Sequence, residues 1–155
     1  MRTTDLVNSA AKFIQIHTNQ SYQESKIEAE EILMHVLGVS KSKIYTNLSI
    51  SMTEDEHYQI TRILNKRKSD IPLSYVLKKH SFYNHEFFVD ENVLIPRPET
   101  ENIIDQIITM GDKLFRDLKR CIFLDAGCGS GCVGITLAIE SCLLYTSDAA
   151  DDCVC

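Results

Sequence analysis

The sequence predicts an α/β protein in which a small helical bundle comes first and a parallel α/β sheet begins after it. Two observations predict this class. Apolar residues recur at helical spacing between residues 4 and 68, and the spacing changes to alternation after Pro72. Farther along, the apolar run 121–124 leads into a glycine-rich loop and a second apolar segment, which is the pattern of a strand, a tight turn and a helix.

Four segments follow from these changes of pattern. We expect a helical domain over residues 1–70, a β-hairpin linker over 71–92, the beginning of an α/β domain over 93–140, and a tail over 141–155. A chain of 155 residues has room for one ordinary domain or two small ones.

The composition is that of a globular protein, with 44% hydrophobic and 25% charged residues. A net charge of −6 argues against a general nucleic-acid binder, whose affinity depends on cations that neutralise phosphates. No apolar run approaches the roughly 20 residues of a membrane span, and the N-terminus has no apolar signal core. We therefore expect a cytoplasmic protein without direct nucleic-acid or membrane partners. The six cysteines form no Cys-x-x-Cys and have no His among them, so we expect mostly buried, reduced thiols and no metal site.

The helical half contains two capping patterns of the type Ser/Thr-x-x-Glu. The expected elements are a helix over 4–17, a helix that begins at the pair Ser25 and Glu28 and ends at Gly38, a short helix near 44–48, and a helix that begins at the pair Thr53 and Glu56 and ends near Lys68. We interpret the three cations 66–68 as a solvated helix end that complements the helix dipole, in preference to a phosphate site.

After the helices, the sequence changes to short extended segments. Ile71-Pro72 breaks the helical pattern, and the apolar residues that follow predict short strands at 73–77, 82–83 and 87–89, with a hairpin around Asn84-His85. Pro96-Arg97-Pro98 then makes a stiff segment, and Thr100 is placed to cap a helix with the apolar face Ile103, Ile104, Ile107 and Ile108. Arg97 either pairs with Glu99 or Glu101 in a structural elbow or forms a wall of a ligand pocket.

The glycine-rich loop follows the expected strand and carries the main functional signal. Its sequence is Asp125-Ala-Gly127-Cys128-Gly129-Ser130-Gly131. Glycine permits positive φ and close approach of a ligand to the backbone, and the helix behind the loop offers unpaired N–H groups. Residues 129–134 fit the dinucleotide pattern G-x-G-x-x-G, and an ordinary turn that needs glycine for geometry alone is the structural alternative.

The wider pattern Asp-x-Gly-x-Gly-x-Gly resembles motif I of class I methyltransferases, which bind S-adenosylmethionine on a Rossmann-like sheet. In that superfamily the loop packs against the amino-acid end of the cofactor and the acid helps to place its ammonium group. The resemblance implies that Gly127, Cys128, Gly129, Ser130 and Gly131 bind the cofactor together with Asp125.

Two further strings narrow the resemblance to one family. Pro72-Leu-Ser-Tyr-Val-Leu77 and Val93-Leu-Ile-Pro-Arg-Pro-Glu-Thr-Glu101 precede the glycine loop in the order found in the HemK/PrmC family, the glutamine N5-methyltransferases of peptide chain release factors. The resemblance covers residues 1–140. It implies methyl transfer from S-adenosylmethionine to the glutamine side-chain amide of the release factor's Gly-Gly-Gln motif. It also implies a helical N-terminal domain that recognises this protein substrate, and a place for Arg97, Thr100 and Glu101 beside the cofactor.

The sequence departs from the family in its last part. The family's acceptor motif, Asn-Pro-Pro-Tyr, is absent from the 155 residues, so no catalytic residue is assigned and we expect an inactive fragment. Residues 141–155 resemble translated adapter sequence, which predicts a non-native tail. Alternatively, residues 143–145 form a second strand, and Asp148 binds the cofactor ribose.

Two other functions remain open from the residues alone. The G-x-G-x-x-G match is compatible with a fragment of a nicotinamide-dependent oxidoreductase, although the acid directly before the loop and the Ile-Pro-Arg-Pro string count against it. The helical half is also compatible with a non-catalytic module that binds a partner protein.

Overall fold

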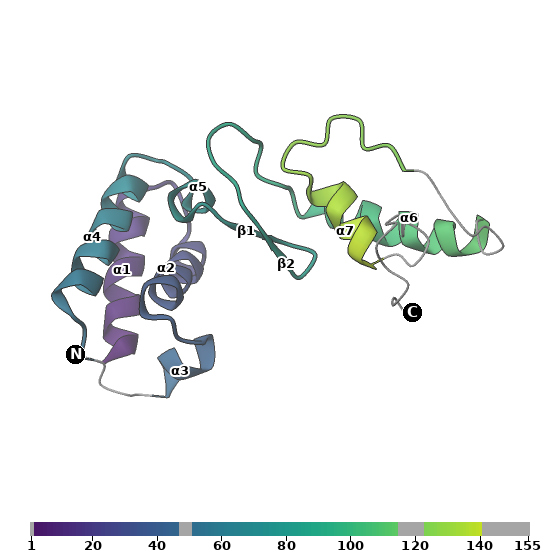
Figure 1. The fold of residues 1–155 in the computed structure, drawn as a ribbon. Coiled ribbons are helices and arrows are strands. Elements are labelled where there is room, and N and C mark those ends of the chain that lie inside the picture. Colours follow the sequence, from purple (N-terminus) through teal and green to yellow (C-terminus); the bar gives the residue numbers. More distant parts are fainter. Residues whose placement is uncertain (1, 47–50, 115–122, 141–155) are drawn as a thin grey trace. The chain divides into compact units, whose positions relative to one another are not determined.

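The computed structural model describes residues 2–46, 51–114 and 123–140, and the chain divides into two compact units (Figure 1). The first unit is Met1–Leu77 and the second is Lys78–Cys155. The first contains α1 (Thr3–His17), α2 (Tyr22–Leu37), α3 (Lys41–Tyr45), α4 (Glu54–Lys68) and α5 (Leu73–Leu77). The second contains β1 (His80–Phe82), β2 (His85–Phe87), α6 (Glu99–Leu114) and α7 (Cys132–Glu140).

The first unit is a helical bundle in which α1, α2 and α4 lie side by side (Figure 1). Apolar residues three and four positions apart on these helices meet in one core, because that spacing places them on one face. The buried members of this core are Val7, Ala10, Ala11, Ile14, Ala29, Ile32, Leu33, Ile44, Ile60, Leu73 and Leu77.

The helix ends of the first unit show which capping patterns are used. Thr53 and Glu56 form the expected capping box at the start of α4, and Gly38 ends α2 with φ +61°. The expected pair Ser25 and Glu28 was wrong, because α2 begins one turn earlier. There Ser21 accepts from the Glu24 backbone N–H and Glu24 accepts from the Ser21 N–H.

Residues 73–77 form the short helix α5, not the expected strand. The carbonyl of Pro72 accepts hydrogen bonds from the backbone N–H groups of Tyr75 and Val76, at 3.0 and 3.2 Å. Proline suits the start of a helix because its missing N–H would have no partner there. Leu73 and Leu77, four positions apart, are both buried in the core of the first unit. The first unit therefore includes α5 and ends at Leu77, rather than at residue 70.

In the second unit, β1 and β2 form an antiparallel hairpin in which His80 faces Phe87 and Phe82 faces His85. Its turn residues are Tyr83 and Asn84, with φ of +49° and +64°. Positive φ at both central residues is typical of the tight turn that matches strand twist. The hairpin expected around residues 84–85 is thus present, with its turn one residue earlier.

The helix α6 begins at Glu99, so Thr100 lies in its first turn and not at the expected cap position. Of the four isoleucines on its expected apolar face, Ile104 is fully buried, Ile107 and Ile108 are partly buried, and Ile103 is 51% exposed. Ile104 shares a core with Phe82, Phe87, Cys132 and Leu137.

The expected strand before the glycine loop is not formed by the part of it that the structure describes. Cys121 and Ile122 lie outside the described residues; Phe123 and Leu124 are not in a strand and are 38% and 85% exposed. A strand of a parallel sheet is buried on both faces by neighbouring elements. The hairpin is the one sheet among the described residues, and its two strands pair only with each other. The segment before the glycine loop therefore has no neighbouring strand among the described residues.

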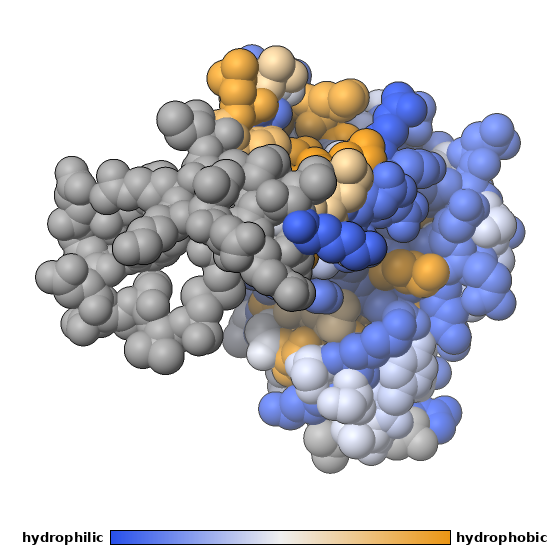
Figure 2. All heavy atoms as spheres, turned by 90° about the vertical axis from the view of Figure 1, so that its right-hand side faces the viewer, coloured by the Kyte–Doolittle hydropathy of each residue, from blue (hydrophilic) through white to orange (hydrophobic). Residues whose placement is uncertain are grey.

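Apolar surface is visible on the face shown in Figure 2. Among the described residues of the second unit, the large, exposed apolar side chains are Phe88, Leu94, Ile103, Met110, Phe123, Leu124, Ile135 and Ile139. Within residues 2–46, 51–114 and 123–140, none of the helices combines the length and apolar character needed to cross a bilayer.

Candidate functional site

The glycine loop adopts a backbone conformation that favours glycine at three positions. Gly127, Gly129 and Gly131 have φ of +87°, +55° and +77°, a region that residues with a Cβ rarely adopt. The N–H of Gly131 donates to the carbonyl of Cys128 at 2.7 Å and closes the turn before α7. The alternating glycines of the sequence therefore have a conformational cause.

The space beside the loop is open. Among the atoms of the described residues, a Cβ added to Gly127 would meet none within 4 Å, and one added to Gly129 would meet the carbonyl oxygen of Gly127 alone, at 4.0 Å. Ala126, which precedes Gly127, and Cys128, which lies between the two glycines, are both exposed. A ligand can therefore approach the loop backbone directly, at positions that any larger residue would occupy.

Asp125 connects the loop to the helix behind it. Its Oδ2 accepts a hydrogen bond from the N–H of Gly134, the third residue of α7, at 3.1 Å. This N–H is one of the first four of a helix, which have no partner within the helix. A Cβ on Gly134 would lie 3.3 Å from the same carboxylate oxygen. The last glycine of G-x-G-x-x-G thus allows the acid to approach the helix.

Ser130 places a polar atom in the loop without a partner. Its Oγ is buried and makes no hydrogen bond to any described residue, and the same holds for Thr136 Oγ1 in α7. A buried hydroxyl without a partner costs free energy, and a polar ligand or an ordered water would remove that cost. With the open cradle at Gly127 and Gly129, this hydroxyl is compatible with a polar ligand.

The segment Arg97–Glu101 leads into α6. Arg97 is exposed and makes no ion pair with Glu99 or Glu101 in the part of the chain that the structure describes, so the expected elbow pairing is not formed. Thr100 is half-buried, and Glu101 accepts from the backbone N–H of Tyr83 at 3.0 Å. The next turn of α6 holds Ile104, which shares its buried core with Cys132, the first residue of α7.

The hairpin contacts α6 and α7 through Tyr83 and His85, to which sequence reasoning gave no role in the site. Tyr83 donates from its hydroxyl to Asp105 Oδ1 at 2.6 Å, and His85 Nε2 lies 2.7 Å from Glu140 Oε1. The hydrogen bond to Asp105 is the main reason why the pKa of Tyr83 is raised. These pairs are 22 and 55 residues apart in the sequence, so no local pattern indicates them.

The two described cysteines of the region differ. Cys132 is buried as expected, whereas Cys128 is exposed on the loop, and both are free thiols. Within the described ranges, no group of His, Cys, Asp and Glu side chains is arranged to hold a metal ion.

The expectations for the tail 141–155 and for Asp148 lie outside the described residues.

Comparison with known proteins gives a consistent family assignment. Residues 5–77 match the family model of the PrmC N-terminal domain, which falls within the first unit. The release factor glutamine methyltransferase of Bacillus cereus is 34% identical over 156 residues, covering 99% of this chain and 53% of the relative. The protein of the same name from Bacillus subtilis is 35% identical over 113 residues, covering 73% of this chain and 39% of the relative. That of Mycoplasma mycoides is 35% identical over 121 residues, covering 78% and 42%.

The chain spans about half the length of the relatives it matches, or less. The alignment with the Bacillus cereus protein covers 99% of the chain and therefore continues beyond Glu140. The non-native origin of residues 141–155 stays a prediction.

Proposed function

Because residues 5–77 belong to the PrmC N-terminal domain family and most of the chain is related to release factor glutamine methyltransferases, we propose that it carries the cofactor loop of such an enzyme. The reaction is methyl transfer from S-adenosylmethionine to the side-chain amide of the glutamine in the Gly-Gly-Gln motif of a peptide chain release factor. The release factor is the protein partner, and neither nucleic acid nor membrane is bound directly. The proposed location is the cytoplasm.

The observation that supports the cofactor is the geometry of the loop. Three glycines at positive φ, with open space beside Gly127 and Gly129, form a cradle that any Cβ would occupy. We propose that the backbone of residues 127–131 holds the amino-acid end of S-adenosylmethionine, and that the Ser130 hydroxyl gains a hydrogen-bond partner, which it lacks among the described residues. The cofactor supplies an activated methyl group on its sulfonium sulfur.

Asp125 has two roles in this proposal. Its carboxylate stabilises the first turn of α7 through Gly134, and that contact fixes the acid next to the loop. A fixed negative charge at this place favours the ammonium group of the cofactor, because opposite charges within a few ångströms attract strongly when partly shielded from water. Arg97, Thr100 and Glu101 are proposed to line the neighbouring side of the cofactor site.

The acceptor half of the reaction needs residues that these 155 do not supply. An amide nitrogen is a poor nucleophile because its lone pair is delocalised, so catalysis depends on positioning the NH₂ group in line with the methyl group. No Asn-Pro-Pro-Tyr string is present to provide the hydrogen-bond acceptors that would hold this NH₂ group. We therefore assign no catalytic residue and expect no methyl transfer by the 155-residue chain alone.

Titration calorimetry tests the cofactor half of the proposal. S-adenosylhomocysteine should bind to the chain and NAD should not, and Gly129→Val should abolish binding because its side chain fills the cradle. The matched control is Gly38→Val. Gly38 has a similar φ of +61° and an equally open Cβ position, but it lies at the end of α2 in the other unit.

The outcomes separate the candidate functions. Binding of NAD in place of S-adenosylhomocysteine would establish the oxidoreductase alternative. Unchanged S-adenosylhomocysteine affinity in Gly129→Val would show that the loop is an ordinary turn. A second assay uses labelled S-adenosylmethionine and unmodified release factor: turnover well above background would show that the acceptor site lies within these residues.

A further inference from the structure

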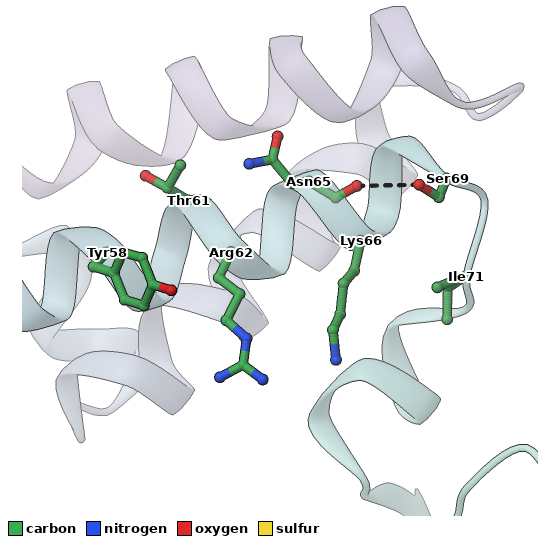
Figure 3. Close-up of a pocket in the computed structure, with 7 residues that line it drawn as sticks. All are labelled: Tyr58, Thr61, Arg62, Asn65, Lys66, Ser69 and Ile71. Carbon is green, nitrogen blue, oxygen red and sulfur yellow. Dashed lines mark hydrogen bonds between the residues drawn. The ribbon is translucent and has the colours of Figure 1, made fainter.

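A basic groove lies on the outer face of α4 in the first unit (Figure 3). It has a volume of about 350 Å³, and Tyr58, Arg62, Asn65, Lys66, Ser69 and Ile71 line it. Figure 3 shows the side chains of Arg62 and Lys66 extending from the helix in the same direction. The groove presents two cations, an aromatic ring and the polar side chains of Thr61, Asn65 and Ser69 on one surface.

The two cations of the groove have no carboxylate partner among the described residues. Arg62 and Lys66 are one turn apart on α4, and both are exposed. Like charges at this spacing repel each other, which costs a few tenths of a kcal/mol. Their neighbour Arg67 differs, because it is 4% exposed and binds Glu28 and the carbonyl of Ile71. Arg67 holds the bundle together, whereas Arg62 and Lys66 stabilise no described contact.

An apolar groove adjoins the basic groove. It has a volume of about 280 Å³, and its large apolar lining residues are Leu6, Phe13, Leu33, Met52, Ile60 and Leu64. Thr61 lines both grooves, so they meet on α4. A single partner segment can therefore place an apolar side chain in one groove and carboxylates beside the cations of the other.

We propose that these two grooves together dock an acidic segment of a partner protein that carries at least one large apolar side chain. This inference rests on the proposed function in one respect, since the partner is taken to be the release factor substrate. It adds the surface of the first unit that makes the contact and the chemistry of the segment that is bound. Apolar burial supplies affinity, and the charge pairs set orientation and selectivity.

Charge distribution favours a protein segment over a nucleic acid. A nucleic-acid strand is held by a track of cations that neutralise successive phosphates. Here the first turn of the same helix carries Glu54, Asp55 and Glu56, and the whole chain has a net charge of −6. The two cations of the basic groove can pair with the carboxylates of a short acidic segment, but they do not form a longer track of cations for successive phosphates.

The test measures binding of purified, unmodified release factor to the 155-residue chain by titration calorimetry. The double variant Arg62→Glu/Lys66→Glu should bind about tenfold more weakly or worse, since it places like charges against the segment. The matched control is Lys68→Glu. Lys68 lies in the same last turn of α4 but does not line the groove, so affinity should change less than about twofold. The milder variant Arg62→Gln/Lys66→Gln keeps the test valid if charge reversal perturbs folding.

Three outcomes would overturn the inference. One is release-factor affinity that is the same in the double variant and the parent chain. The second is an equal loss in Lys68→Glu, which would indicate a general charge effect. The third is tighter binding of a 20-nucleotide uridine RNA than of release factor, lost in the double variant. S-adenosylhomocysteine affinity should stay unchanged in every α4 variant, so failure of docking is distinguishable from failure of the cofactor proposal.

Discussion

The carboxylate of Asp125 accepts a hydrogen bond from the backbone N–H of Gly134, with 3.1 Å between Oδ2 and the nitrogen. This contact joins the two ends of the glycine pattern. The carboxylate of Asp125 accepts a hydrogen bond from a backbone N–H in the first turn of α7 that has no partner within the helix. The absence of a Cβ on Gly134 leaves room for this carboxylate. The glycines between them turn the chain by adopting positive φ. The pattern from residue 125 to residue 134 is thus one structural unit.

Asp125→Ala should loosen the first turn of α7. Loss of a capping side chain costs about 1 kcal/mol, which corresponds to roughly fivefold faster exchange of the protected amide. Hydrogen exchange of the Gly134 amide, followed by NMR, measures this directly. Asp125→Asn is the control, because its side-chain carbonyl can still accept the bond. Equal exchange rates in Asp125→Ala and the parent chain would show that the contact is not stabilising.

Arg67→Met should destabilise the first unit strongly. The Nε and Nη2 atoms of Arg67 donate to the two oxygens of Glu28 at 2.8 and 3.1 Å, and the arginine is 4% exposed. Removing one partner of a buried ion pair costs about 3 kcal/mol, because the remaining charge loses its compensation. Urea unfolding measures the change, with exposed Arg62→Met on the same helix as a control expected within about 0.5 kcal/mol.

A double variant of the same pair tests whether the unpaired charge of Glu28 causes the loss of stability in Arg67→Met. In the double variant Glu28→Gln/Arg67→Met no charge is left behind, so it should be more stable than Arg67→Met alone. A double variant that is as unstable as the sum of both single variants would mean that the two side chains act independently.

The stability of the first unit should depend on pH through Glu30. Burial by itself raises the pKa of this carboxyl, but hydrogen bonds from Lys41 and Tyr45 together outweigh it, and the pKa is lowered from 4.5. Lys41 Nζ lies 2.7 Å from Glu30 Oε2. Because the folded pKa is the lower one, the stabilisation is present above pH 4.5 and is lost as pH falls through the folded value.

Comparison of Glu30→Gln with the parent chain between pH 3 and 7 isolates this effect, in roughly the range where such carboxyls titrate. The difference in free energy of unfolding should be constant near neutral pH and should shrink in acid. Glu91→Gln, at an exposed loop position, is the control and should show little change. A difference that does not vary with pH would contradict the assignment.

Tyr83 should titrate above the ordinary tyrosine value. Its hydrogen bond to Asp105, then burial and the charge of Asp105, raise the pKa from 10.0. The bond therefore contributes fully below pH 10.0, and its contribution is lost as pH rises through the folded pKa. Asp105→Asn should return the pKa toward 10.0. Tyrosinate absorbance, with the Tyr83→Phe spectrum subtracted, follows this residue alone, and an unchanged midpoint in Asp105→Asn would exclude the bond.

Elements specified by contacts within one or two turns could be predicted from the sequence. The first helix, the capping box of Thr53 and Glu56 and the end of α2 at Gly38 all follow from residues close together in the chain. The glycines of the loop also belong here, because positive φ is a property of the single residue. The family resemblance rested on such local strings, and the comparisons confirm it.

Tertiary packing decided the elements for which the local sequence allows two answers. Ser21-x-x-Glu24 and Ser25-x-x-Glu28 fit a capping box equally well. The first is used because Ser25 is fully buried and Glu28 binds Arg67, 39 residues away. Likewise, the run 73–77 suits a strand by alternation and a helix by its leucines, and burial of both leucines in the bundle core selects the helix.

Some features of the candidate site could likewise be predicted from the sequence, and others depended on tertiary contacts. The sequence by itself indicated a tight turn before a helix at residues 125–131, since glycine readily adopts the positive φ that residues with a Cβ rarely adopt. Only the tertiary structure decided that Asp125 caps α7, that Glu101 holds the hairpin turn through Tyr83, and that the cations at the end of α4 separate into a buried Arg67 and an exposed groove. These contacts join residues that are distant in the chain or point to different sides of one helix, and burial and partner geometry decide between the alternatives.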